Sequence, residues 1–225
     1  MGLDMYLNRM PRYRGATAND VCAVESYLDW MKEKEKDDSP YASDTFKEWC
    51  GIDEVPQERY IKFYSKFYNT KYASYDIEHK YGCDRIMEQV GYWRKCNAIH
   101  NWFVENVQDG IDDCNYHHEV TEDKLKDLLK TCHTVLESIE LVDGKLNCGK
   151  QYKDGKWETV WRDGKVIKDY SVVEKLLPTT SGFFFGGTDY NEWYVDTIKD
   201  TIEIVEKVLK TTDFDKEMIY YVSSW

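Results

Sequence analysis

The side chains best able to do chemistry fall in one short segment. They are Gln89, Trp93, Asn97 and His100, spaced by four, four and three residues. On a continuous helix this spacing would form a single polar stripe whose neighbours touch. The His100 imidazole could serve as a general base or bind a ligand, and the adjacent Arg94 could neutralise a phosphate or carboxylate. The alternative is a polar seam that is hydrogen-bonded within the fold, with Trp93 in the core.

A glycine-rich turn is the second candidate. Gly186 and Gly187 follow three phenylalanines and precede a predicted helix. Glycines at this place let an anion approach the backbone N–H groups of a helix N-terminus. If the turn meets the polar stripe, Tyr190 and Trp193 would help to line one aromatic and polar pocket. The alternative is a plain turn followed by a helix cap.

A zinc site is the third possibility, in the acidic loop that follows residue 110. The possible ligands are Asp112, Asp113, Cys114, His117 and His118, with Cys132 and His133 further along. Their spacing matches no standard zinc motif, so we assign no metal and keep Cys114, His117 and His118 only as weak candidates.

Helices predicted from apolar spacing must position these residues. One long helix is expected over 84–110, and Gly91 within it would mark a close packing contact. Asp189 and Glu192 form a possible capping box for the last helix. Further helices are predicted over 17–35, 43–50, 121–139, 171–177 and 189–209. Residues 56–83 predict a helix with an aromatic face, followed by irregular structure. The alternative is a hairpin after Tyr72, because Tyr and Phe favour strands.

Strand patterns lie at both ends of the chain and in one insertion. Residues 2–9 and 218–225 are expected to share a sheet, and 183–185 to form a short buried strand. Asp-Gly dipeptides at 143, 154 and 163 predict an antiparallel meander. Its strands would be 145–152, 156–161 and 165–169. We therefore predict an α+β fold for 1–225, a mainly helical single domain with a small antiparallel sheet and a β-hairpin or meander insertion at 140–169.

The charge of the chain limits its partners. The net charge is −12, which argues against direct nucleic-acid binding because phosphate contacts need clustered Lys and Arg. An acidic protein could instead occupy the basic groove of a partner. No apolar run reaches the length of a membrane span, and no secretory signal is recognisable. The seven cysteines are odd in number and contain no C-x-x-C pair, so we expect reduced thiols in a cytoplasm. We predict no cofactor.

Several segments together resemble a known family. They are Met-Gly-Leu-Asp-Met-Tyr-Leu at 1–7, Val-Gly-Tyr-Trp-Arg-Lys-x-Asn-Ala-Ile-His-x-Trp-Phe-Val at 90–104, Val-Gln-Asp-Gly at 107–110, Asp-Asp-Cys at 112–114, and Leu-Leu-Pro-Thr-x-Ser-Gly-Phe-Phe-Phe-Gly at 176–186. The pattern is similar to that of a family of small uncharacterised bacteriophage and prophage proteins. Some members carry the name phosphoglycerate kinase, yet this chain has no Gly-x-x-x-x-Gly-Lys-Ser/Thr phosphate loop. The resemblance implies a phage origin and work in the host bacterial cytoplasm.

These observations predict a phage accessory protein that acts by binding rather than by turnover. As a counter-defence factor it would capture a small anionic, nucleotide-like ligand, with Arg94 neutralising charge and Trp93 or Tyr190 stacking. One alternative is an acidic, anti-CRISPR-like inhibitor that imitates nucleic acid and blocks a host defence enzyme. A third is an enzyme with His100 as general base, whose acidic partner would come from elsewhere in the fold.

Overall fold

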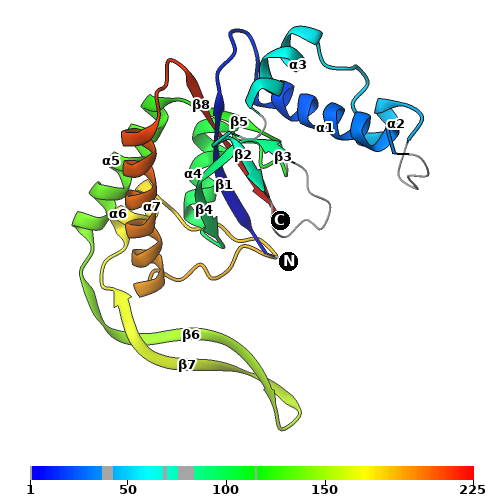
Figure 1. Ribbon diagram of the computed structural model, residues 1–225. Coiled ribbons are helices and arrows are strands. Elements are labelled where there is room, and N and C mark those ends of the chain that lie inside the picture. The colour runs from blue at the N-terminus through cyan, green and yellow to red at the C-terminus, as the bar shows by residue number, and fades with distance from the viewer. Residues whose placement is uncertain (1, 37–42, 68–69, 76–83, 115) are drawn as a thin grey trace.

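A four-stranded antiparallel sheet forms the centre of the protein (Figure 1). The computed structural model describes residues 2–36, 43–67, 70–75, 84–114 and 116–225. The strand order is β4–β1–β8–β5, with bounds Glu88–Arg94, Asp4–Pro11, Glu217–Ser224 and His118–Val120. The two terminal strands pair along their whole length, from Asp4 opposite Ser224 to Pro11 opposite Glu217. The prediction that both ends of the chain share a sheet is therefore confirmed.

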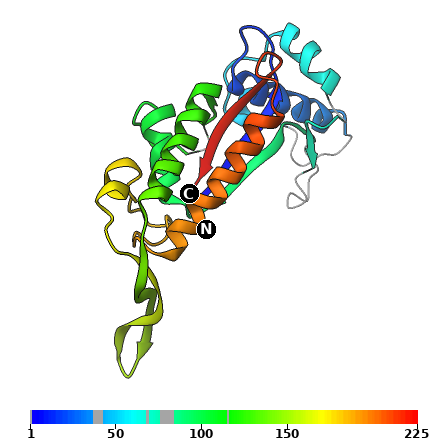
Figure 2. The ribbon, with the colours of Figure 1, turned by 90° about the vertical axis from the view of Figure 1, so that its left-hand side faces the viewer.

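Helices cover both faces of this sheet (Figures 1 and 2). Three pack on the face that carries Leu3, Met5 and Leu7, and they build the larger core. They are α4 (Asn97–Val107), α5 (Glu122–Ser138) and α7 (Glu192–Thr211). A smaller core on the opposite face joins Met218 and Tyr220 to α1 (Ala18–Lys34) and α3 (Glu58–Tyr64). Successive side chains of a strand point to opposite faces, so β8 contributes to both cores.

The single long helix predicted over 84–110 is wrong. Residues 84–86 and 88–94 form the strands β3 and β4, and α4 begins only at Asn97. Lys95 adopts a positive φ of 58° at the junction. The strand forms because β4 pairs with β1, and this tertiary pairing outweighs the helical spacing of the apolar residues. Gly91 does mark a close contact, since a Cβ there would lie 2.7 Å from Ile204 Cγ2.

The insertion is a long two-stranded hairpin rather than a three-stranded meander. Strand β6 (Leu141–Lys153) pairs with β7 (Lys156–Ile167), and the hairpin projects from the body (Figures 1 and 2). Only the Asp-Gly dipeptide at 154–155 forms the turn. The other two lie within the ladder, where Gly144 is opposite Gly164. The fold class is confirmed as α+β, with helices, a small antiparallel sheet and a hairpin insertion.

Most helix predictions are confirmed, with changes at their ends. Thr17 caps α1 through a capping box, and Thr121 caps α5. Helix α7 is capped by Asn191 rather than by Asp189, because the Asn191 side chain accepts the first N–H groups. The shorter elements are α2 (Phe46–Cys50), a 3-10 helix (Ser65–Phe67), β2 (Ala73–Tyr75), β3 (Asp84–Ile86) and α6 (Ser171–Leu176).

Two other predictions concern short segments. Residues 183–185 form a turn rather than a buried strand, and Phe183 is 95% exposed. The helix predicted within 56–83 is confirmed as α3. The irregular structure predicted after it is wrong at Ala73–Tyr75, which form a strand paired with Asp84–Ile86, and residues 76–83 lie outside the described residues. Within the described segments, no helix combines the length and apolar character needed to cross a membrane.

Candidate functional site

The predicted polar stripe is divided between two elements. Gln89, Trp93 and Arg94 lie on β4, whereas Asn97 and His100 lie on α4. They therefore do not form a helical stripe, because the chain changes from strand to helix between them. The spacing that suggested one surface holds only when all of the residues are helical.

The three strand residues have different surroundings. The Trp93 indole is buried, and its Nε1–H donates to Thr201 Oγ1 at 3.0 Å. Arg94 is exposed, with Nε 3.8 Å from an Asp4 carboxylate oxygen. Gln89 is also exposed. Trp93 thus belongs to the core, which is the alternative that the sequence left open.

The glycine turn at Gly186 and Gly187 does not line a common pocket with the predicted residues of β4. Gly186 has a φ of +89° and packs against Lys95, and α7 starts only after Asn191. Tyr190 stacks on Tyr170 with ring centres 5.1 Å apart, at the base of the hairpin. Trp193 is exposed beside Arg162. Of the predicted ligand-binding residues, only Tyr190 lines either of the two described cavities, so the single predicted pocket is not formed.

Asn97 instead shapes the loop at 180–187. Its Nδ2 donates to the carbonyl oxygens of Phe185 and Gly187, at 3.1 and 2.8 Å. Its Oδ1 accepts the Thr180 N–H at 3.2 Å. One buried amide therefore satisfies three backbone groups of an irregular segment, which fixes the conformation of that segment.

His100 is fully buried and lies between a tyrosine and a carboxylate. Its Nδ1 is 2.7 Å from the Tyr221 hydroxyl. Its Nε2 is 3.1 Å from Asp112 Oδ1, within ion-pair distance but without hydrogen-bond alignment. Burial lowers the pKa of His100 and nearby Asp112 opposes this shift, whereas burial raises the pKa of Tyr221 well above its ordinary value. The imidazole is thus held neutral and away from solvent.

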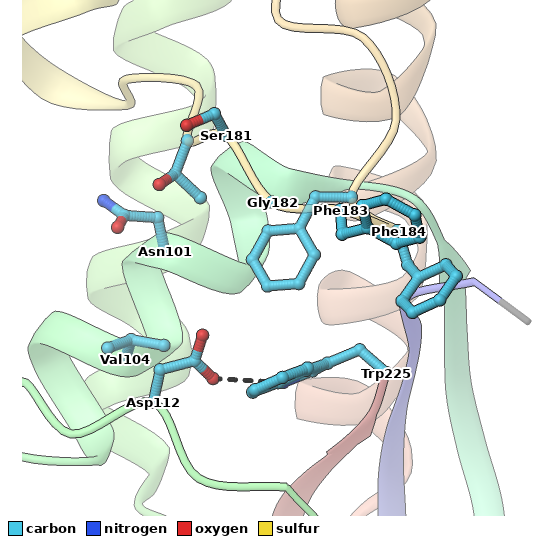
Figure 3. Close-up of a pocket in the computed structure, with 10 residues that line it drawn as sticks. Asn101, Val104, Asp112, Ser181, Gly182, Phe183, Phe184 and Trp225 are labelled. Atoms are coloured by element: carbon cyan, nitrogen blue, oxygen red, sulfur yellow. Dashed lines mark hydrogen bonds between the residues drawn. The ribbon is translucent and has the colours of Figure 1, made fainter.

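Asp112 connects this buried pair to a cavity of about 400 Å³. The cavity lies between α4, the loop at 180–185 and the end of β8 (Figure 3). The Asp112 side chain is 34% exposed, and its Oδ1 accepts the Trp225 Nε1–H at 3.2 Å. The lining residues are Asn101, Val104, Asp112, Thr180, Ser181, Gly182, Phe183, Phe184, Phe185 and Trp225.

The chemistry of this lining is aromatic and acidic. Phenyl and indole rings offer flat surfaces for stacking. The Asp112 carboxylate accepts hydrogen bonds, and Asn101 and Ser181 add further polar groups (Figure 3). Among the described residues that line the cavity there is no Lys or Arg. The arrangement suits a planar ring with N–H donors better than a phosphate or carboxylate.

The sequence did not identify the main residues of this cavity. Asp112 appeared only as a possible zinc ligand, and Trp225 only as part of the closing strand. The two are more than one hundred residues apart and meet because β8 crosses the centre of the sheet. Local spacing carries no signal for such a long-range pair.

The proposed zinc ligands are dispersed. His118 Nε2 is 3.0 Å from Asp113, and His117 approaches the Cys22 sulfur at 3.6 Å. The Cys114 thiol contacts the Trp225 carbonyl, at 3.7 Å. No group of three or more His, Cys, Asp or Glu side chains suited to a metal ion occurs within the described part of the chain.

The fold and the cavity define an α+β protein with an aromatic, acidic pocket at one end of its central strands. Comparisons with family models, curated proteins and solved structures gave no match. Because one fold can host many activities, we argue function from the chemistry of the pocket.

Proposed function

We propose that this protein is a binding protein that holds the flat ring of a nucleotide-like ligand in the pocket beside Asp112. The observation that carries the proposal is the Asp112 carboxylate, which is held by Trp225 and faced by the aromatic loop. The volume of about 400 Å³ falls within the range of small-ligand sites. A nucleobase would stack on the aromatic rings and donate its exocyclic or ring N–H groups to the carboxylate.

The charge of the pocket determines which part of a nucleotide-like ligand could enter it. The Asp112 carboxylate in the lining repels a phosphate. Arg94, which the sequence predicted would neutralise a phosphate, lies on β4 and is not part of the lining. The base would therefore enter the pocket, while any phosphates would remain at its open side. On this basis a nucleoside should bind at least as well as its nucleotide.

Binding rather than catalysis is favoured by the position of His100. Its side chain is 1% exposed, so it cannot touch a ligand that occupies the cavity. The group that faces the cavity is Asp112, and His100 supports it from behind. We infer that His100 positions the carboxylate and does not act as a base on a substrate.

The resemblance to phage proteins supports a counter-defence role. Capture of a small signalling molecule requires only affinity and a sufficient amount of protein. We therefore retain the proposal that the protein removes a nucleotide-like ligand from the host cytoplasm by binding it.

The proposal is tested by thermal unfolding with matched ligands. Nucleobases, nucleosides, linear nucleotides and cyclic nucleotides are added separately, because a ligand that binds only the folded state raises the melting temperature. We expect at least one nucleoside to raise it as much as the corresponding nucleotide. If no member of the panel raises it, or if only phosphate-bearing members do, the proposed pocket chemistry is wrong.

A variant pair links the shift to the pocket. Asp112→Asn removes the carboxylate charge and should abolish most of the ligand-induced shift. Asp109→Asn is the control, because it makes the same change in an exposed residue of the same loop outside the cavity. Asp109 has a φ of +54°, which Asn tolerates well, so the control should fold and bind as the unmodified protein does. Equal shifts in both variants would exclude Asp112 as the recognition group.

A further inference from the structure

The β6–β7 hairpin carries an unusual group of exposed aromatic side chains. Tyr152, Trp157 and Trp161 are 65%, 67% and 59% exposed. Tyr152 lies opposite Trp157 in the ladder, with ring centres 5.5 Å apart. Trp161 is four residues after Trp157 on β7, so the two side chains point to the same face. We call the β6–β7 hairpin the arm, and these three side chains its aromatic face.

The arm lacks a core of its own. Leu146 and Ile167 are buried near its base, but beyond them its side chains are mostly exposed. The arm extends away from the sheet and the helices (Figures 1 and 2). A two-stranded hairpin alone is only marginally stable in water. Exposed Trp and Tyr on such an element are typical of the central residues of protein interfaces.

The charge of the arm is opposite to that of the rest of the protein. Residues 141–167 contain six basic and four acidic side chains, a net charge of +2. The whole chain carries −12, so the remaining residues together carry −14. Lys150 and Lys153 are exposed and lie on β6 within two residues of Tyr152. We call the rest of the chain the body. The positively charged arm is therefore attracted to acidic surfaces, and the body carries the acidic charge of this protein.

We propose that the arm docks on the acidic body of a second copy of this chain. Reciprocal docking of two arms would form a closed twofold dimer, in which each copy gives one arm and receives another. Pairing of one arm with the other is disfavoured, since both carry +2 and lysines at exposed strands hinder edge-to-edge pairing. The partner surface would cover the aromatic face, and the charge difference would orient the encounter.

The proposal is tested by measuring the mass of the full chain in solution by sedimentation and by light scattering over a dilution series. A single chain has a mass of 26.7 kDa. We expect a concentration-dependent species with the mass of two chains, and a shift toward the single chain when salt is raised, because salt screens the attraction. A single-chain mass at every concentration would overturn the proposal.

Two variants of the arm, each with its control, locate the contact. Trp157→Ala should shift the equilibrium toward the single chain at least tenfold, whereas Tyr92→Ala removes an exposed ring of the body and should not. The double variant Lys150→Glu with Lys153→Glu should also weaken the dimer. Its control, Lys47→Glu with Lys66→Glu, makes the same change in net charge at exposed sites outside the arm.

These substitutions affect exposed side chains, so melting temperatures should verify that each variant remains folded. A dimer that is unchanged by both arm variants would show that a different surface holds the two copies together, and it would overturn the proposal. A dimer that is weakened equally by an arm variant and by its control would do the same.

Discussion

Asp112 Oδ1 lies 3.1 Å from Nε2 of His100, and this pair joins the pocket to the core of the protein. On the pocket side, Asp112 accepts a hydrogen bond from Trp225. On the core side, His100 contacts the Tyr221 hydroxyl at 2.7 Å. A change at any member of this series should therefore affect the position of the carboxylate that faces the pocket.

The buried imidazole predicts a loss of stability at acidic pH. Burial lowers the pKa of His100 below its ordinary value of 6.5, although Asp112 opposes part of the shift. As pH falls below 6.5, the unfolded chain takes up a proton that the folded protein resists. The unfolded state then binds more protons, so the free energy of unfolding decreases by up to about 1.4 kcal/mol per pH unit from this group. Above pH 6.5 this contribution to stability is fully present.

Denaturant unfolding at several pH values tests this expectation. His100→Gln removes the titrating group, so its unfolding free energy should depend less on pH between about 6.5 and 5. The variant should also be less stable at neutral pH, because a packed ring is lost. His133→Gln is the control, since the His133 side chain is 48% exposed. Parallel pH profiles for the His100 variant and the unmodified protein would contradict a buried neutral imidazole.

Removal of the Asn97 amide should release the loop that forms one wall of the pocket. Asn97→Ala leaves the carbonyl oxygens of Phe185 and Gly187 and the Thr180 N–H without their partner. An unsatisfied buried polar group costs about 1–3 kcal/mol, so we expect a loss of at least that size. Ligand-induced thermal shifts should fall as well, because the aromatic wall is no longer fixed.

Asn106→Ala is the matched control for this loop. Asn106 lies on the same helix, is exposed, and donates only within the helix, to the Trp102 carbonyl. It should change the unfolding free energy by less than about 0.5 kcal/mol, as most surface substitutions do. Similar losses in both variants would mean that Asn97 contributes through α4 itself and not through the loop.

The sequence was sufficient for elements whose signal is local. The Thr17 cap, the apolar stripe of α7 and the alternation of Leu3, Met5 and Leu7 each agree with the structure. Such patterns are determined by contacts along one element, so a single sequence contains them. The same is true of the Asp-Gly turn at 154–155, where the backbone needs positive φ.

Elements that depend on distant partners could not be found in this way. Residues 88–94 have a spacing that fits a helix, but pairing with β1 makes them a strand. The pocket requires Asp112 and Trp225 to meet across the fold. Asn97 and His100 are polar residues of the otherwise largely apolar helix α4, and their roles depend on the loop and on β8. A polar residue with a buried partner is visible in sequence only as an exception to the apolar pattern.

The cysteines should differ sharply in reactivity. Cys132 is fully buried on α5, and burial raises its pKa to about 12, so almost no reactive thiolate is present at neutral pH. Cys114 and Cys148 are exposed. Under native conditions a thiol reagent should label these two rapidly, while Cys132 should react only when the protein unfolds. Peptide mass spectrometry measures the site of labelling, and equal rates for Cys132 and Cys148 would contradict the packing of α5 against α7.

Gly91 allows β4 to approach α7, and a methyl group there should disturb the contact. A Cβ at this position would lie 2.7 Å from Ile204 Cγ2 and 3.3 Å from Leu7 Cβ. The Ile204 side chain is β-branched and has little freedom to move within a helix. Gly91→Ala should therefore reduce the unfolding free energy by about 1–3 kcal/mol, the usual effect of overpacking.

A double variant separates this steric effect from a general effect of replacing glycine. Adding Ile204→Ala should remove the clash, so Gly91→Ala should destabilise the Ile204→Ala background much less than it destabilises the unmodified protein. Gly187→Ala is the control, because a Cβ at that position meets no atom within 4 Å. Chemical denaturation of the four proteins in the cycle measures the coupling. If the two substitutions are additive, the close approach of β4 to α7 does not depend on the absence of a side chain at Gly91.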